Sequence, residues 1–204
     1  YVGGPEHSTM HLLYFRFWAM VMQELGLTAE DEPVRRLITQ GIVNGPDGRK
    51  MSKRWGNVIT PASIVERYGA DAARTFVSFA GPPDKDIDWS DEQVEGCARF
   101  LHRVWRIAWS QQGCAAVRWD GPFEGRALEI RRAAHKALKR VTEDIERLSF
   151  NTAVARCMEL ANFLGPIEPS TDAEKAAMAE AVRLLSTMLS PIAPHVAEEI
   201  AEAY

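Results

Sequence analysis

Helix start and stop signals restrict the second part of this chain to a series of helices. Ser90-Asp91-Glu92-Gln93 and Thr171-Asp172-Ala173-Glu174 are capping boxes, in which side chains bond the first free N–H groups of a helix. One more N-cap candidate, a helix stop and two helix breakers follow the same logic: Asn151, Gly165, Pro191 and Pro194. We therefore predict a bundle of four or five helices over residues 84–204.

The first part of the chain combines helices with an extended segment. Apolar residues at helical spacing predict a helix over residues 6–25, with Gly26 as its stop. Residues 36–43 are rich in aliphatic side chains and predict a short strand or extended segment. Thr60-Pro61 predicts a helix start, and Gly69 separates that helix from a second short one.

A domain border is expected near residue 83. The stop Gly81-Pro82-Pro83 is followed by an acidic stretch over residues 84–88, and both features are typical of a boundary. The sequence therefore divides into residues 1–83 and residues 84–204.

The composition describes a soluble globular protein. Of 204 residues, 46% are apolar and 25% charged, which suits an ordinary folded core. No apolar run approaches the roughly 20 residues needed to cross a bilayer, and the N-terminus lacks the pattern of a signal peptide. We expect a cytoplasmic protein without a membrane partner. Cys97, Cys114 and Cys157 form no CxxC pair, so we expect reduced thiols rather than a disulfide framework or a zinc site.

The net charge of −4 hides a basic region. Residues 99–140 carry ten Lys or Arg against three acids, whereas residues 166–204 carry two against seven. Arg99, Arg103 and Arg106 share one helix face, which suits contact with the phosphates of a nucleic acid. A solvated face with neighbouring acids is about as good an interpretation.

A short basic segment, Lys50-Met51-Ser52-Lys53-Arg54, lies between a Gly-Pro-Asp-Gly turn and a Trp-Gly-Asn step. Two ammonium groups on flexible stems, a hydroxyl and free backbone N–H donors can bind a phosphate and follow it as it moves. Such a loop suits the chemistry of a nucleoside triphosphate. On composition alone, however, a solvated basic turn is the commoner interpretation.

A second candidate site lies at the N-terminus, where Gly3, Gly4 and Glu6 precede His7 and His11. The glycines allow close approach of the backbone to a ligand, and the carboxylate can accept hydrogen bonds from sugar hydroxyls. Histidines four residues apart share a helix face, which allows a substrate pocket, plain helix packing or a zinc site. The zinc protease pattern places Glu directly after the first His, whereas Glu6 precedes His7 here, so we expect no metal site.

Several segments together resemble the leucyl-tRNA synthetase family of class I aminoacyl-tRNA synthetases. KMSKR resembles the KMSKS signature of that class. Further agreement comes from six segments: Tyr1-Val2-Gly3-Gly4-Pro5-Glu6-His7, His11-Leu12-Leu13-Tyr14-Phe15-Arg16-Phe17, Gln40-Gly41-Ile42-Val43, Val65-Glu66-Arg67-Tyr68-Gly69-Ala70-Asp71, Asp88-Trp89-Ser90 and Val94-Glu95-Gly96. The resemblance covers nearly the whole chain. It implies a mostly α fold: the C-terminal part of a Rossmann-like α/β catalytic domain, followed by an anticodon-binding-type helical bundle.

The resemblance also implies an activity and its residues. It implies ATP-dependent activation of leucine and transfer to tRNA(Leu), with Mg²⁺ bound mainly through the nucleotide, by a monomeric enzyme. The implied catalytic residues are Lys50 and Lys53. The implied leucine pocket is Tyr1, His7 and His11. The implied ATP-binding residues are Gly4, Glu6, Gln40, Val43, Lys50, Ser52 and Lys53, and the implied tRNA contacts are Arg99 and Arg103.

Two departures qualify the resemblance. Arg54 stands where the motif has Ser, and the chain contains no HIGH motif, first half of the nucleotide-binding fold or editing domain. We therefore expect the chain to be inactive by itself. Two alternatives stay open: a non-catalytic tRNA-binding helical module, which has no need of the N-terminal cluster, and a valyl- or isoleucyl-tRNA synthetase, against which the His-Leu-Leu-Tyr block argues.

Overall fold

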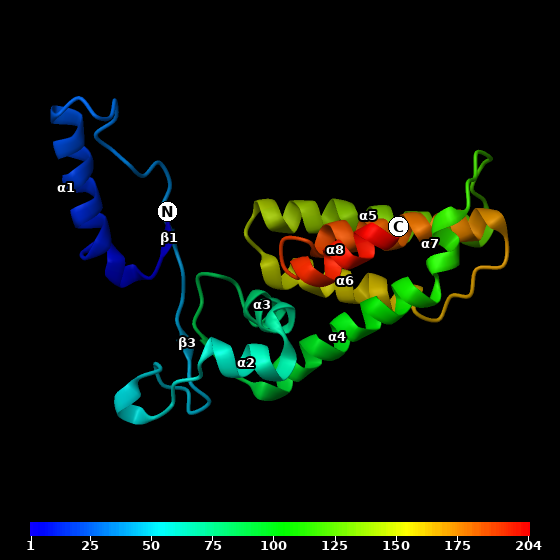
Figure 1. Ribbon diagram of the computed structural model, residues 1–204, viewed down its shortest axis with the longest axis horizontal. Coiled ribbons are helices and arrows are strands. Elements are labelled where there is room, and N and C mark those ends of the chain that lie inside the picture. The colour runs from blue at the N-terminus through cyan, green and yellow to red at the C-terminus, as the bar shows by residue number, and fades with distance from the viewer. The chain divides into compact units, whose positions relative to one another are not determined.

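The computed structural model describes residues 1–204, and helices dominate it (Figure 1). The helices are α1 (His11–Glu24), α2 (Pro61–Tyr68), α3 (Ala70–Phe79), α4 (Asp91–Ser110), α5 (Gly125–Glu146), α6 (Phe150–Leu164), α7 (Asp172–Leu189) and α8 (Pro194–Ala203). The strands are β1 (Val2–Gly3), β2 (Ile38–Thr39), β3 (Val43–Asn44) and β4 (Ile87–Asp88). Short 3₁₀ turns cover Pro5–Ser8, Lys53–Trp55 and Gln112–Ala116. None of the helices combines the length and apolar character that a membrane crossing requires.

The chain forms two compact units. Unit 1 consists of Tyr1–Val58 and Pro83–Trp89, and unit 2 consists of Ile59–Pro82 and Ser90–Tyr204. This division differs from the expected border at residue 83. The reason is packing: α2 and α3 bury apolar side chains such as Phe76 in unit 2, whereas the segment after Pro83 pairs its backbone with β3 in unit 1.

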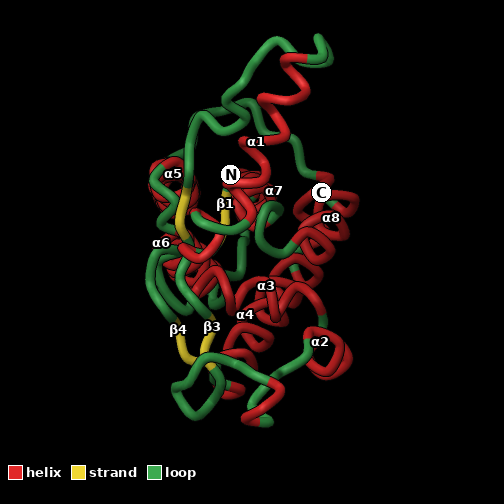
Figure 2. Tube along the Cα trace, turned by 90° about the vertical axis from the view of Figure 1, so that its left-hand side faces the viewer, coloured by secondary structure: helices red, strands yellow, loops and turns green.

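Unit 1 is built on two parallel ladders of two residues each. β1 pairs with β2, and β3 pairs with β4. Figure 2 shows β3 and β4 side by side. The extended segment expected over residues 36–43 is thus two short strands with different partners. Gly41 lies between them, where a Cβ would come 2.1 Å from the backbone oxygen of Lys85, so only glycine fits.

Helix α1 begins later than expected. Pro5–Ser8 forms a 3₁₀ turn, and the α-helix starts at His11. The expected stop at Gly26 is confirmed, because its φ of +70° favours glycine and its N–H bonds the carbonyl of Gln23. No residue of α1 is buried, and its exposed side chains include large aromatic ones: Tyr14, Phe15, Phe17 and Trp18.

Unit 2 confirms the predicted helical bundle. α5 packs against α6 and α7, and the core continues into α3, α4 and α8 (Figure 1). Apolar residues at helical spacing are buried, such as Val104 and Ala108 of α4 and Ala134 and Val141 of α5. Cys97 and Cys157 lie in this core, where burial raises the thiol pKa to about 11 and about 12. All three cysteines are unpaired.

Three predicted N-caps are confirmed and one is wrong. The hydroxyls of Thr60, Ser90 and Thr171 each accept a hydrogen bond from the N–H three residues on. Asn151, expected to cap α6, lies inside it. Leu148 takes a left-handed φ of +61°, and Ser149 N–H bonds the carbonyl of Asp144, so α5 ends in a Schellman motif and α6 begins at once.

Helix α3 holds the turn between α7 and α8. Asp71 is only 6% exposed, and its carboxylate bonds the His195 ring at Nδ1 (2.8 Å) and the N–H of Val196 (2.8 Å). It therefore caps α8, whose own N-cap is an alanine without a side-chain acceptor. Arg74 donates to the carbonyls of Ile192 (2.9 Å) and Pro191 (3.0 Å), which follow the end of α7.

We predict that Asp71→Ala lowers the free energy of unfolding by about 1–3 kcal/mol, because it removes a cap and leaves the N–H of Val196 without its partner. Urea denaturation of wild type and variant measures the difference. Asp120→Ala, at an exposed loop aspartate, is the matched control and should change stability little. Equal stability of the two variants would contradict the capping role.

Candidate functional site

The basic loop is the end of a tight turn rather than an open segment. Gly45 N–H bonds the carbonyl of Arg49 (2.8 Å), and an antiparallel bridge joins Asn44 to Lys50. Gly48 sits in this turn with a φ of +71°, a conformation that favours glycine. The turn fixes where the loop starts, because it places Lys50 opposite Asn44 at the end of β3.

The side chain of Asn57 organises the loop. Its Oδ1 accepts the N–H of Ser52 (2.8 Å), and its Nδ2 donates to Asp47 Oδ1 (2.9 Å) and to the carbonyl of Arg49 (3.3 Å). The sequence reasoning gave Asn57 no role. The available signal was its place directly after Gly56, whose φ of +65° ends the 3₁₀ turn and brings the amide back under the loop.

Asp47 anchors the same turn. Hydrogen bonds from Asn57 and Arg49 to its ionised form lower the pKa of this carboxyl from 3.8 to about 2. Because the folded-state pKa lies below the ordinary value, these bonds stabilise the turn above about pH 4 and are lost as the pH falls towards 2.

The predicted phosphate-binding lysines are exposed. Lys50 Nζ lies 4.0 Å from Glu6 Oε1, and this contact joins the basic loop to the N-terminal cluster within unit 1. Lys53 begins the 3₁₀ turn and makes no ion pair, so its ammonium group is free to bind an anion. Ser52 caps that turn, and its hydroxyl accepts the N–H of Arg54 (3.2 Å).

Arg54, the departure from the motif, is directed at an aromatic ring. Its guanidinium lies 5.2 Å from the centroid of the Trp55 ring, and that of Arg49 lies 4.9 Å from the same ring. These cation–π contacts occupy both arginines, so Lys53, which makes no ion pair, is the unpaired cation of the loop.

Aromatic stacking orders the N-terminal cluster. The rings of Tyr1 and His11 stack with centroids 5.4 Å apart, and His7 meets His11 edge-on at 6.3 Å. His7 Nδ1 is buried without a hydrogen-bond partner, a state that most buried polar atoms avoid. A Cβ on Gly4 would lie 2.4 Å from the Glu6 carboxylate, so the glycine allows that side chain to fold over the backbone. No group of three or more His, Cys, Asp or Glu is placed to hold a metal ion.

Of the two remaining ATP-binding candidates, Gln40 lies directly after a strand and Val43 lies on one. Gln40 follows β2, and its N–H bonds the carbonyl of Gly3 (3.0 Å), which places it beside the N-terminal cluster. Val43 belongs to β3 and pairs with Ile87 of β4. The structure therefore brings Gln40 to the cluster, while Val43 is placed by a different strand pair.

The two arginines expected to contact tRNA are on α4 in unit 2. Arg99 pairs with Glu95 one turn away (2.8 Å), and both are exposed. Arg103 donates to the side chain of Asn162 on α6. Further basic groups line a cavity of about 210 Å³ between α5 and α6, among them Lys136, Arg140 and Arg156. The structure thus spreads positive charge over α4 and α5.

Two family models match the chain. Residues 10–90 match the class I tRNA synthetases of the I, L, M and V types, and residues 127–204 match the anticodon-binding domain of tRNA ligases. A leucine–tRNA ligase of Citrifermentans bemidjiense is 46% identical over 98% of the chain, and one of Geotalea daltonii is 44% identical over 100%. The chain spans a quarter of the length of these relatives.

Solved structures agree with these matches. The leucyl-tRNA synthetase of Agrobacterium radiobacter K84, in its complex with tRNA and LeuAMS, matches 100% of the chain and 27% of its own with a TM-score of 0.86 and 36% identity. A methionyl-tRNA synthetase of Mycobacterium tuberculosis bound to methionyl-adenylate matches 98% of the chain and 43% of its own, with a TM-score of 0.72 and 20% identity, which shows a shared fold. The expected fold class is confirmed.

We predict that Asn57→Ala raises the pKa of Asp47 from about 2 towards 3.8, because the strongest hydrogen bond to its carboxylate is lost. An NMR titration of the Asp47 carboxyl carbon measures this change. Asn151→Ala, in α6 of unit 2, is the control and should leave the titration unaltered. An Asp47 pKa that stays near 2 in Asn57→Ala would show that Arg49 alone maintains it.

Proposed function

The chain belongs to the leucyl-tRNA synthetase family of class I aminoacyl-tRNA synthetases, and from this premise we propose that it serves an enzyme that activates leucine with ATP and transfers it to tRNA(Leu). The observation that carries the proposal is the pairing of Lys50 with Glu6, which joins the basic loop to the N-terminal cluster. A binding module without chemistry has no use for that arrangement.

The two lysines act on the triphosphate. When the leucine carboxylate attacks the α-phosphorus of ATP, the bond to pyrophosphate breaks and negative charge builds on the leaving group. Lys53, exposed and without an ion pair, stabilises that charge, and Lys50 assists from beside Glu6. Ser52 orients the loop through its cap, while its own N–H is held by Asn57. The catalysis is positioning and electrostatics, with no protein nucleophile.

The N-terminal cluster binds the other parts of the substrates. Tyr1, His7 and His11 form an aromatic wall for the leucine side chain, since two of the rings are already stacked. Glu6 accepts hydrogen bonds from the adenylate ribose, and Gly4 allows its close approach. Gln40 and Val43 lie on the adenine side, with Val43 contributing backbone groups.

Mg²⁺ enters this proposal with the nucleotide. Magnesium keeps several waters and binds substrate phosphates together with few carboxylates. Because no acidic cluster of the chain is placed to hold the ion, its ligands come mainly from the triphosphate.

The helical bundle binds tRNA. Arg99 and Arg103 contact its phosphates, which position the tRNA without specifying its sequence. In family terms, residues 1–83 are the C-terminal part of the catalytic domain and residues 84–204 the anticodon-binding-type domain. The enzyme is proposed to act as a monomer in the cytoplasm.

We predict that Lys53→Ala slows leucine-dependent exchange of pyrophosphate with ATP by about 10²–10³-fold and leaves leucine binding nearly unchanged, because the charge that it stabilises exists only in the transition state. The assay uses the full-length gene product, with valine and isoleucine in parallel. Lys85→Ala, at another exposed lysine of unit 1, is the control. Preference for valine or isoleucine would reassign the amino acid, and no exchange by the wild type would favour a tRNA-binding module.

We predict that Arg103→Ala weakens tRNA(Leu) binding and lowers the slope of log K against log salt by about 1, as expected for the loss of one phosphate contact. Filter binding over a range of salt concentrations measures both quantities. Arg183→Ala, on α7, is the control and should keep the wild-type slope. An unchanged slope for Arg103→Ala would mean that Arg103 only holds Asn162.

A further inference from the structure

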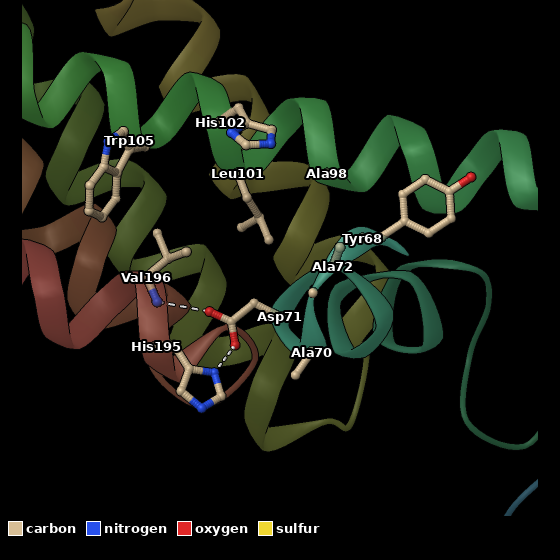
Figure 3. Close-up of a pocket in the computed structure, with 11 residues that line it drawn as sticks. Tyr68, Ala70, Asp71, Ala72, Ala98, Leu101, His102, Trp105, His195 and Val196 are labelled. Carbon is tan, nitrogen blue, oxygen red and sulfur yellow. Dashed lines mark hydrogen bonds and ion pairs between the residues drawn. The ribbon is translucent and has the colours of Figure 1, made fainter. Parts of the chain in front are cut away.

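Unit 2 contains a cavity of about 570 Å³ between α3, α4 and α8 (Figure 3). This volume lies within the range of small-ligand sites. Small and aliphatic side chains form much of its lining: Ala70, Ala72, Ala98, Leu101 and Val196. In Figure 3, His102 and Trp105 come to it from α4 and Tyr68 from the end of α2. An apolar lining with aromatic and imidazole rings suits a flat heteroaromatic ligand.

The polar groups of the pocket are prearranged. Asp71 holds Nδ1 of His195, so in the neutral ring the proton is on Nδ1 and Nε2 is a hydrogen-bond acceptor. The His195 side chain is 75% exposed, and in Figure 3 its Nε2 points away from Leu101 and Trp105, so this ring lies at the rim of the pocket.

The charged side chains along α4 indicate where the backbone of a nucleic acid would lie. Arg99, His102 and Arg106 are spaced by three and four residues and therefore form one stripe, and His102 is also part of the pocket. Arg106 is exposed and makes no hydrogen bond or ion pair. The α8 side instead carries Glu198 and Glu199, which repel phosphates. The α4 side thus suits a polyanion, next to a pocket that suits a base.

We propose that this pocket binds one unstacked nucleobase of the bound tRNA, with the adjoining sugar-phosphate backbone along Arg99, His102 and Arg106. The inference rests on the proposed function, because it needs tRNA as the partner. Trp105 supplies the stacking surface, and stacking on an aromatic side chain holds a base of any sequence.

A matched pair of tryptophans makes the proposal testable. Trp105 and Trp109 are both 37% exposed and stack on each other with centroids 4.0 Å apart, but only Trp105 lines the pocket. Replacing either one by Leu removes the same contact between the rings and a similar exposed area. Only the change at Trp105 removes the stacking surface.

The experiment uses the full-length gene product and a tRNA(Leu) transcript. We expect Trp105→Leu to weaken tRNA binding by about ten-fold, Trp105→Phe to restore most of the affinity, and Trp109→Leu to bind like the wild type. Leucine-dependent pyrophosphate exchange without tRNA should be normal in all three variants, which shows that they are folded.

Chemical probing of the tRNA bases identifies the occupant. We expect one unpaired base to be protected by the wild type and by Trp109→Leu, and to become reactive again with Trp105→Leu. Equal tRNA affinity of the two leucine variants, or no base whose protection depends on Trp105, would overturn the proposal. Free AMP is also tested as a competitor of tRNA binding. If AMP competes equally well with the wild type and with Trp105→Leu, a free nucleotide is not the ligand of this pocket. If AMP competes with the wild type but not with Trp105→Leu, the pocket binds a free nucleotide and the proposal of a tRNA base is overturned.

The two proposals fail in different ways. If the wild-type protein binds no tRNA or exchanges no pyrophosphate with leucine, the proposed function is wrong. If both activities are present and the tryptophan variants do not differ in affinity, only the nucleobase pocket is wrong.

Discussion

The buried carboxylate of Asp71 holds together the part of the molecule that carries most of its core. It is the one buried carboxylate of the chain, and burying a charge is costly unless it is paired and hydrogen-bonded. Here a backbone N–H and an imidazole supply those bonds, so the cost is offset and α8 gains the cap that its own sequence lacks. Arg74, one turn along α3, bonds the carbonyls of the preceding turn. The single short helix α3 thus holds the turn between α7 and α8 at both of its ends. In the sequence, α2 and α3 come directly after the basic loop.

The basic loop is shaped by neutral and acidic groups rather than by its own lysines. Asn57 satisfies the backbone of the loop, Asp47 neutralises Arg49, and Trp55 takes up the guanidinium groups of Arg49 and Arg54. The lysines are therefore left for an anion, with only a 4.0 Å contact between Lys50 and Glu6. This arrangement suits phosphoryl chemistry, in which the positive charge on the loop has to be available when negative charge develops on the leaving group.

Much of this structure could be predicted from local chemistry. Thr60, Ser90 and Thr171 cap helices as their positions indicate, because a cap is decided by side chain and backbone atoms within four residues. The stop at Gly26 and the bundle of amphipathic helices follow for the same reason. The wrong cap at Asn151 has a physical cause: Leu148 takes a left-handed conformation that a leucine rarely adopts, which ends α5 and lets α6 begin before Asn151. The late start of α1 reflects Pro5–Ser8, whose 3₁₀ turn the apolar spacing does not distinguish from an α-helix.

The sequence by itself determined the helical bundle, the glycines at its turns and the residues of the lysine loop, since these depend on periodicity, φ angles and motif chemistry. Only the tertiary structure decided which groups meet across long stretches of chain. The bond between Asp71 and His195 spans 124 residues, Lys50 reaches Glu6, and α2 and α3 join unit 2 although they precede the expected border. The pocket beside Trp105 is another feature that only the tertiary structure decided, because it is lined by three segments that are neighbours only after folding. Local signals act within a few residues. Contacts between distant segments depend instead on burial and hydrogen bonding in the whole folded chain, and no single segment carries that information.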